Sequence, residues 1–302
     1  MSIAPTSDAP DSTPPLLELA RDRATIRLNR PRHRNRIERA DVDVLLELLA
    51  SVEANPELRV LVLTGTGSMF CAGYDLGALK TEAADTVSAD PGPDVFERMV
   101  DRIEDLRIPT ICALNGGVYG GATDMALACD FRIGVEGMEL GMPASRLGVH
   151  YYLSGMRRYV TRLGLGAAKR LFLTGVPMPA EKLMEIGYLD ELVPAGALAA
   201  RVDALATLLG SRAPLAVQGM KRALNAIARG NPDARQVDDD VLRCMPLGGS
   251  PRRVGGLEGE TRAGVPGPLR RDYCSPTPTV TLTSMVSVEA PLRTPRTGAA
   301  DQ

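Results

Sequence analysis

The chain carries Phe70-Cys71-Ala72-Gly73-Tyr74-Asp75-Leu76 after one apolar run and Asn115-Gly116-Gly117-Val118-Tyr119-Gly120-Gly121-Ala122-Thr123-Asp124 after another. Glycine and other small residues let a backbone turn sharply and approach a ligand closely. Glycine pairs before a helix also expose N–H donors at its positive end, where they can bind a phosphate or stabilise a developing oxyanion. Neither stretch has the Walker or dinucleotide-binding spacing. Taken alone, the first stretch fits a plain structural turn better than a ligand site, and the second fits either equally well.

The surrounding sequence predicts alternating strands and helices. Short apolar runs predict a strand pair over 16–28 and strands over 60–63, 110–114 and 131–134. Apolar residues at helical spacing predict helices over 40–52, 95–106 and 120–128. From residue 154 onward the pattern is helical, over 154–163, 167–173, 180–186, 195–209 and 214–229. This order favours an α/β fold with a largely buried sheet.

Together, the stretches FCAGYDL and GGATDMALACD resemble the crotonase superfamily of enoyl-CoA hydratases and isomerases, and the resemblance runs from about Leu16 to Arg229. It implies an α/β fold with a crotonase-like ββα spiral core, a helical C-terminal trimerisation region and a coenzyme A thioester as ligand. We expect the core over 15–190 and the helical region over 191–243. Residues 1–14 and the Pro/Gly-rich residues 244–302 are expected to be disordered.

Composition excludes several other classes of protein. The formal net charge is -2 and aromatic residues make up 4%, which argues against a nucleic-acid partner or an anionic membrane surface. No apolar run is long enough to span a bilayer. The five cysteines are scattered and only two histidines occur, so we expect no disulfide framework, no metal site and a cytoplasmic location.

In the crotonase superfamily two backbone N–H groups bind the thioester oxygen, and the matching positions here are Tyr74 and Gly121. Two fixed donors favour the enolate that forms when charge reaches that oxygen. The hydratases also use two glutamates. The first matches Asp124, whereas the second falls at Ala144, which cannot transfer a proton. Hydration by paired carboxylates is therefore not expected, and Asp124 as a helix-supporting residue stays open.

The stretch Arg146-Leu147-Gly148-Val149-His150-Tyr151-Tyr152-Leu153-Ser154-Gly155 resembles a loop of the methylmalonyl-CoA decarboxylases of the same superfamily. Their active-site tyrosine matches Tyr151, and a proline of theirs matches His150. Decarboxylation needs no general base, only an oxyanion hole and a pocket that disfavours the ionised carboxylate. His150 is alternatively a proton donor or base, because its ordinary pKa is near 6.5. The alternative for both residues is a structural role, in which they pack at the start of a helix.

Further residues are assigned to substrate binding by the same resemblance. In the basic run from Arg30 to Arg36, we expect Arg32 and Arg34 to contact the phosphates of CoA, because guanidinium groups suit phosphate. The remaining predicted contacts are Ala72, Asp75, Leu76, Gly120 and Pro143. Two assignments are structural: Arg157-Arg158 is expected to be a surface pair, and Cys71 a buried thiol.

The resulting prediction is an acyl-CoA lyase or isomerase that works through a stabilised thioester enolate. Its reaction is left between a hydratase-like (EC 4.2.1) and a decarboxylase-like (EC 4.1.1) step. A non-catalytic acyl-CoA-binding homologue that has lost the paired carboxylates is the alternative. No cofactor beyond the CoA moiety is expected, and the partners implied are an acyl-CoA and further copies of the chain in a homotrimer or a dimer of trimers.

Overall fold

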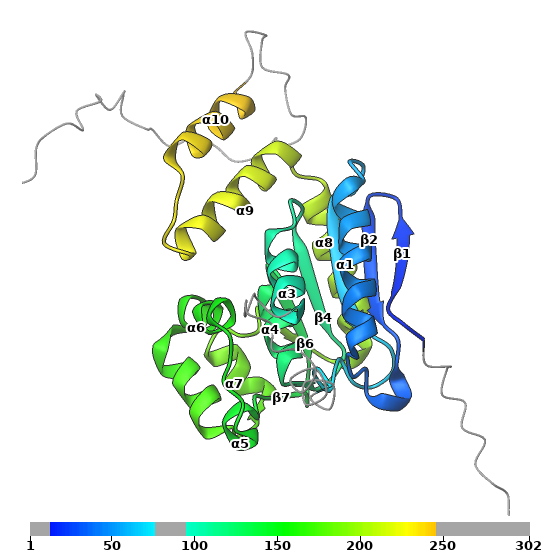
Figure 1. Cartoon of the computed structure of the whole chain (residues 1–302). Helices are drawn as coiled ribbons and strands as arrows, with labels where there is room; N and C mark the ends of the chain where they lie inside the picture. Colours follow the sequence, from blue (N-terminus) through cyan, green and yellow to red (C-terminus); the bar gives the residue numbers. More distant parts are fainter. Residues whose placement is uncertain (1–12, 76–94, 246–302) are drawn as a thin grey trace, which may run out of the picture. The chain divides into compact units, whose positions relative to one another are not determined.

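The computed structural model describes residues 13–75 and 95–245. A six-stranded sheet forms its centre, in the order β1-β2-β3-β4-β6-β9. Figure 1 labels four of these strands, β1, β2, β4 and β6. Only the β1–β2 pair is antiparallel, and the other neighbours run parallel. The strands are β1 (Leu16–Ala20), β2 (Arg23–Leu28), β3 (Val60–Gly65), β4 (Thr110–Leu114), β6 (Phe131–Val135) and β9 (Glu191–Val193).

The sheet is covered and linked by helices. These are α1 (Arg39–Ala54), α3 (Val95–Asp105), α4 (Gly121–Ala128), α5 (Ala144–Leu147), α6 (Leu153–Thr174), α7 (Ala180–Glu185), α8 (Leu198–Gly210), α9 (Pro214–Ala228) and α10 (Ala234–Cys244), with 3-10 turns at Pro31–His33 and Ala195–Ala197. Helix α8 packs on β3, β4 and β6, while α3 contacts α1, α4, α6 and α9. The prediction of an α/β fold with a helical C-terminal region is confirmed.

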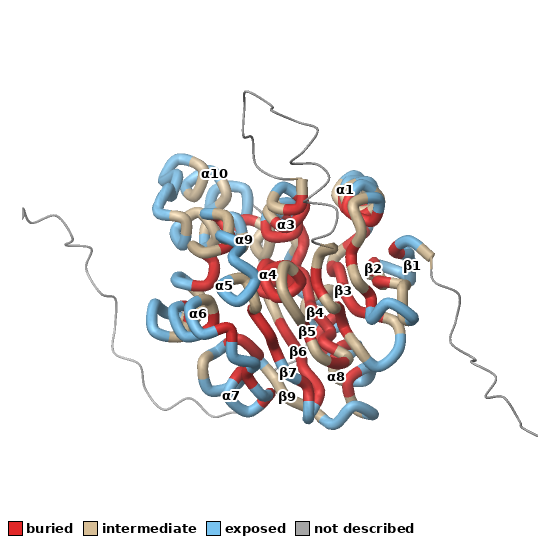
Figure 2. The backbone as a smooth tube through the Cα atoms, turned by 60° about the horizontal axis from the view of Figure 1, so that its bottom comes forward, coloured by how far each residue is buried: buried red, intermediate tan, exposed pale blue. Residues whose placement is uncertain are grey.

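The central strands are buried over their whole length. Every residue of β3 and β4 is buried, as expected for parallel strands covered on both faces (Figure 2). Strand β2 alternates between buried and half-buried residues, because its neighbour β1 is the exposed edge of the sheet. The core therefore lies along β3, β4 and β6 and under α4, whose residues after Gly121 are all buried.

Strand pairing brings the two glycine-rich stretches together. Strands β3 and β4 are parallel neighbours, with Thr64 opposite Ala113, so the segments that follow them leave the same edge of the sheet. The first of these segments contains Ala72 to Tyr74, and the second contains Gly120 and leads into α4. The strand order thus brings two stretches that are distant in sequence to the same edge of the sheet.

Two features of the fold were not predicted. The sheet continues beyond residue 190, where β9 completes it and α8 packs on it. A second sheet, not predicted, joins β5 (Val118–Tyr119), β7 (Glu139–Gly141) and β8 (Met178–Pro179). Strands this short are not detectable by alternation, which needs at least four residues. The predicted disordered ends lie almost entirely outside the described residues.

Candidate active site

The two predicted loops are hydrogen-bonded to each other. The Tyr119 N–H donates to the Cys71 carbonyl oxygen at 3.0 Å, and the Cys71 N–H donates to the Gly117 carbonyl oxygen at 3.3 Å. These bonds make a short parallel bridge between Cys71 and Val118. The backbone at Gly73 and Tyr74 is thereby held beside the start of α4.

Glycine is required where the loops touch. Gly73 has a φ of 102°, and a Cβ there would lie 2.8 Å from the Tyr119 carbonyl oxygen. A Cβ on Gly121 would lie 2.8 Å from ring carbons of Phe96. Gly121 is also the first residue of α4, where an N–H group has no acceptor within the helix. The close approach therefore explains why small residues recur in both stretches.

A cavity of about 420 Å³ opens between these loops, α3, α5 and the segment that joins α5 to α6. Its lining residues are Ala72, Gly73, Tyr74, Phe96, Gly120, Gly121, Met142, Pro143, Ala144, Leu147, Val149, His150, Tyr151 and Tyr152. The structure therefore brings together seven of the predicted site residues: Ala72, Tyr74, Gly120, Gly121, Pro143, His150 and Tyr151. The two predicted oxyanion donors, Tyr74 and Gly121, line the same space.

The wall of this cavity is aromatic. The Tyr74 and Phe96 rings lie 5.1 Å apart, and Phe96 lies 6.5 Å from Tyr152. Tyr151 stacks on Tyr152 with ring centroids 4.3 Å apart and an interplanar angle of 23°. No Asp, Glu, Lys or Arg is among the described lining residues. The acyl end of a ligand would therefore meet apolar faces and a few hydroxyl groups.

Three side chains with polar groups, His150, Tyr151 and Tyr152, line the cavity directly before α6. Burial raises the pKa of Tyr151 well above its ordinary value, and the charge of Asp124 raises it further. The same two causes, in the same order, raise the pKa of Tyr152. Both phenols are therefore protonated at neutral pH and act as hydroxyl groups. The His150 Nδ1 lies 2.8 Å from the Tyr151 carbonyl oxygen, and His150 is exposed.

Asp124 does not line the cavity. Its side chain is fully buried in α4, and its carboxylate accepts hydrogen bonds from Arg158 and Tyr152. Tyr152, which donates to this carboxylate, does line the cavity. Ala144, at the position of the family's second glutamate, does line the cavity.

The remaining predicted contacts lie around the site. Arg32 and Arg34 are exposed, and the Arg34 carbonyl oxygen accepts from the Ala72 N–H at 2.9 Å, which ties the basic segment to the cavity loop. The Asp75 carboxylate lies 3.3 Å from a guanidinium nitrogen of Arg36 and does not line the cavity. Leu76 lies outside the described residues.

Sequence reasoning missed Tyr152 and misjudged Arg158. Arg158 is not a surface residue: its side chain is 2% exposed, because it faces the carboxylates of Asp101, Glu104 and Asp124. A pair of adjacent arginines does not show that one of them is fully buried on α6. It also does not show the partners of Arg158, which are all more than 30 residues away in the sequence. Tyr152 had one available signal, its place beside Tyr151.

Other kinds of site find little support in the described part of the chain. Within residues 13–75 and 95–245, no three His, Cys, Asp or Glu side chains are grouped so as to hold a metal ion. Within the same ranges, no helix has the length and apolar character needed to cross a membrane. The Cys71 thiol is buried, as predicted, and burial raises its pKa to about 12.

Comparison with known proteins finds a matching family and similar relatives. The family described as Enoyl-CoA hydratase/isomerase matches residues 22–244. The chain is 34% identical over 225 residues to the carnitinyl-CoA dehydratase of Salmonella heidelberg, covering 73% of this chain and 84% of that protein. It is 31% identical over 213 residues to the (E)-benzylidenesuccinyl-CoA hydratase of Thauera aromatica, covering 70% and 81%.

The fold agrees as well. The crystal structure of the enoyl-CoA hydratase from Bacillus anthracis superposes with a TM-score of 0.67 at 28% identity, over 76% of this chain and 89% of that one. With its crotonase fold, the protein belongs to the enoyl-CoA hydratase/isomerase family.

Proposed function

We propose that this family member is a decarboxylase-like lyase that acts on an acyl-CoA thioester through an enolate. The observation that carries the proposal is the composition of the cavity wall: among the described lining residues there are two oxyanion-donor positions and protonated phenols, but no carboxylate. A hydratase of the family's usual kind needs a base that holds and deprotonates water, and the position of one such base is Ala144.

The proposed reaction begins with a malonyl-type thioester. The bond between the α-carbon and the carboxylate breaks, CO₂ leaves, and the electron pair of that bond forms the enolate. The N–H groups of Tyr74 and Gly121 stabilise the charge on the thioester oxygen. The enolate then takes one proton at the α-carbon, for which Tyr151 and His150 are the candidate donors. The apolar wall favours loss of the charged carboxylate, because it solvates that group poorly.

Hydration of an enoyl-CoA is the second candidate. Two relatives are named as a hydratase and a dehydratase, which favours water chemistry in this part of the family. In this cavity the base would be His150, because the phenols are protonated. The aromatic wall suits a bulky apolar acyl group in either reaction.

CoA is proposed to bind along the basic segment beside the cavity. Arg32 and Arg34 are exposed there, and the bond between the Arg34 carbonyl and Ala72 links their segment to the oxyanion loop. Guanidinium groups bind phosphate through paired N–H donors. No cofactor other than the CoA part of the substrate is proposed.

The test is a panel of thioesters assayed with the purified full-length protein. Malonyl-CoA, methylmalonyl-CoA and an aryl-substituted malonyl-CoA are followed for CO₂ release, and crotonyl-CoA and cinnamoyl-CoA for hydration. We expect CO₂ release that falls at least about tenfold in Tyr151→Phe, since the ring remains while the hydroxyl is lost. Rapid hydration without CO₂ release, abolished by His150→Ala, would establish the second candidate instead. Binding of every thioester without turnover would indicate a non-catalytic homologue.

A further inference from the structure

Asp124 is a buried carboxylate with an unusually complete set of donors. Arg158 donates from Nε to Oδ1 at 2.9 Å and from Nη2 to Oδ2 at 2.7 Å. The Tyr152 hydroxyl donates to Oδ2 at 2.6 Å. Asp124 is 0% exposed, so these three bonds lie in the protein interior. Paired, charge-assisted bonds of this kind fix both distance and direction.

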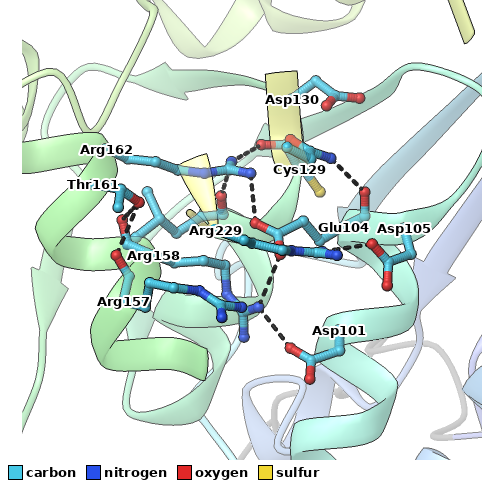
Figure 3. A network of polar contacts seen from close by, with 12 residues as sticks. Asp101, Glu104, Asp105, Cys129, Asp130, Arg157, Arg158, Thr161, Arg162 and Arg229 are labelled. Atoms are coloured by element: carbon cyan, nitrogen blue, oxygen red, sulfur yellow. Dashed lines mark hydrogen bonds and ion pairs between the residues drawn. The ribbon is translucent and has the colours of Figure 1, made fainter. Parts of the chain in front are cut away.

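Arg158 is held beside Asp124 by two further carboxylates, which belong to α3. Its Nη1 lies 2.7 Å from Asp101 Oδ1 and 3.3 Å from Glu104 Oε2 (Figure 3). Glu104 is in turn bonded by Arg162 and Arg229. Burial raises the pKa of Glu104, but these three arginines outweigh burial and hold it below the ordinary value. Glu104 is therefore charged at neutral pH, and the network stays closed.

The network ends at the cavity wall. The Tyr151 hydroxyl donates to the Tyr152 hydroxyl oxygen at 3.3 Å, and the two rings are stacked. A tyrosine hydroxyl has a single proton, and that of Tyr152 is committed to Asp124. Tyr152 can therefore only accept from Tyr151. Without substrate this fixes the sense of the hydrogen bonds, from Tyr151 through Tyr152 to Asp124. If Tyr151 protonates the enolate, its proton leaves the bond to Tyr152.

We propose that Asp124 and Arg158 are positioning residues that act through the Tyr152 hydroxyl to orient Tyr151 at the cavity, and that Asp124 does not contact substrate. The proposal rests on the proposed use of Tyr151 in the reaction. It assigns Asp124 a positioning role, which fits its location on the side of Tyr152 away from the cavity. It also adds Tyr152 to the residues that determine the rate.

A double-mutant cycle on the full-length protein tests this order of action. Tyr152→Phe and Asp124→Asn are each expected to lower kcat about tenfold, in line with the loss of a hydrogen bond to a charged group. KM should stay within about twofold of the unmodified value, because the stacked rings remain. If Asp124 acts through Tyr152, the double variant loses no more than either single variant. Losses that multiply to about 100-fold would overturn the proposal.

A matched control separates positioning from general destabilisation. Tyr188 is fully buried, and its hydroxyl donates to the Thr123 carbonyl oxygen on the same helix at 2.8 Å. Tyr188→Phe therefore removes a comparable bond to α4 that does not lead to the cavity. We expect it to lower the melting temperature while leaving kcat unchanged. An equal loss of kcat in Tyr188→Phe would show that any weakening of α4 slows the reaction.

A second measurement does not depend on turnover. The protein labelled with 3-fluorotyrosine gives a ¹⁹F resonance for Tyr151, assigned by its absence in Tyr151→Phe. We expect this resonance to shift in Asp124→Asn and in Tyr152→Phe, and to stay in place in Tyr188→Phe. An unchanged resonance in a folded Asp124→Asn protein would overturn the positioning role. Should no thioester be turned over, the proposed function fails while this readout still decides the positioning.

Discussion

The Gly121 N–H group can be removed while the new Cβ is controlled for. The Cβ of any side chain at this position would lie 2.8 Å from the Phe96 ring. A lower kcat in Gly121→Pro alone would therefore not distinguish the loss of the N–H donor from this clash. Gly121→Ala introduces the same Cβ and keeps the N–H. We expect Gly121→Pro to be about 10²–10³ slower than Gly121→Ala in kcat, the usual cost of one oxyanion donor. Thermal melts confirm folding, and equal rates in the two variants would contradict the oxyanion assignment.

The Cys71 thiol should be inert despite its place beside the oxyanion loop. Its pKa is raised to about 12 by burial, so below that pH it remains a thiol, whereas alkylation needs the thiolate. We expect iodoacetamide at pH 8 to label the exposed Cys244 and to leave Cys71 unlabelled until the protein is denatured. Peptide mass spectrometry measures both sites. Fast labelling of Cys71 in the native protein would mean that the thiol is exposed.

At the scale of single residues, the sequence predicted what local chemistry dictates. Tyr74 and Gly121 were assigned because their two loops resemble those of the crotonase superfamily, and the structure places both residues at one cavity. The assignment of Arg158 to the surface was wrong, since its three carboxylate partners come from α3 and α4. Pairing between elements decides whether an arginine is buried, and pairing is not visible in one segment.

At the scale of elements, buried charge connects α6 to α3 and α4. Arg158→Leu would leave Asp124 and Glu104 without their shared partner, and removing one member of a buried ion pair typically costs about 3–5 kcal/mol. Arg157→Leu, next along the same helix, should change the free energy of unfolding by less than about 0.5 kcal/mol. Urea denaturation measures both. Similar values for the two variants would show that the network contributes nothing to stability.

The helices and strands were predicted correctly where the segment is long and a residue such as glycine marks its end. Separate helices were predicted over 154–163 and 167–173, and the structure has α6 kinked at Gly164, whose φ of 82° and ψ of 157° lie outside helical values. Glycine adopts that conformation at little cost, so the break is encoded locally. The two-residue strands β5 and β8 have no such local code, because their pairing is set by the loops and helices around them.

At the scale of the molecule, the sheet and its cover include elements that follow residue 190. The chain after that residue adds β9 to the sheet and places α8 on three strands. Hydrophobic periodicity shows that α8 is amphipathic, but it does not show which surface its apolar face covers. A change from mixed to helical sequence therefore marks a change in secondary structure, while the packing of the later elements depends on contacts that one segment does not show.

Large apolar side chains remain exposed on the C-terminal helices of the described chain. Leu224 and Ile227 on α9 are 66% and 59% exposed, and Leu242 on α10 is 62% exposed. An apolar groove also runs between the two helices, lined by Leu215, Ala216, Gly219, Met220, Ala223, Val237, Asp240, Val241, Cys244 and Met245. Contiguous exposed apolar surface usually marks an interface between proteins.

We therefore expect the protein to self-associate through α9 and α10, in agreement with the trimer that its resemblance implies. Sedimentation equilibrium should give a mass above that of one 32.2 kDa chain. Leu224→Glu with Ile227→Glu should shift the equilibrium toward monomer, because a carboxylate buried without a partner opposes association. Leu19→Glu is the matched control, since Leu19 is 58% exposed on the edge strand β1, away from these helices in the sequence. If the Leu19 variant dissociates and the α9 variant does not, the interface lies at the sheet edge, and the apolar surface of α9 and α10 needs another explanation.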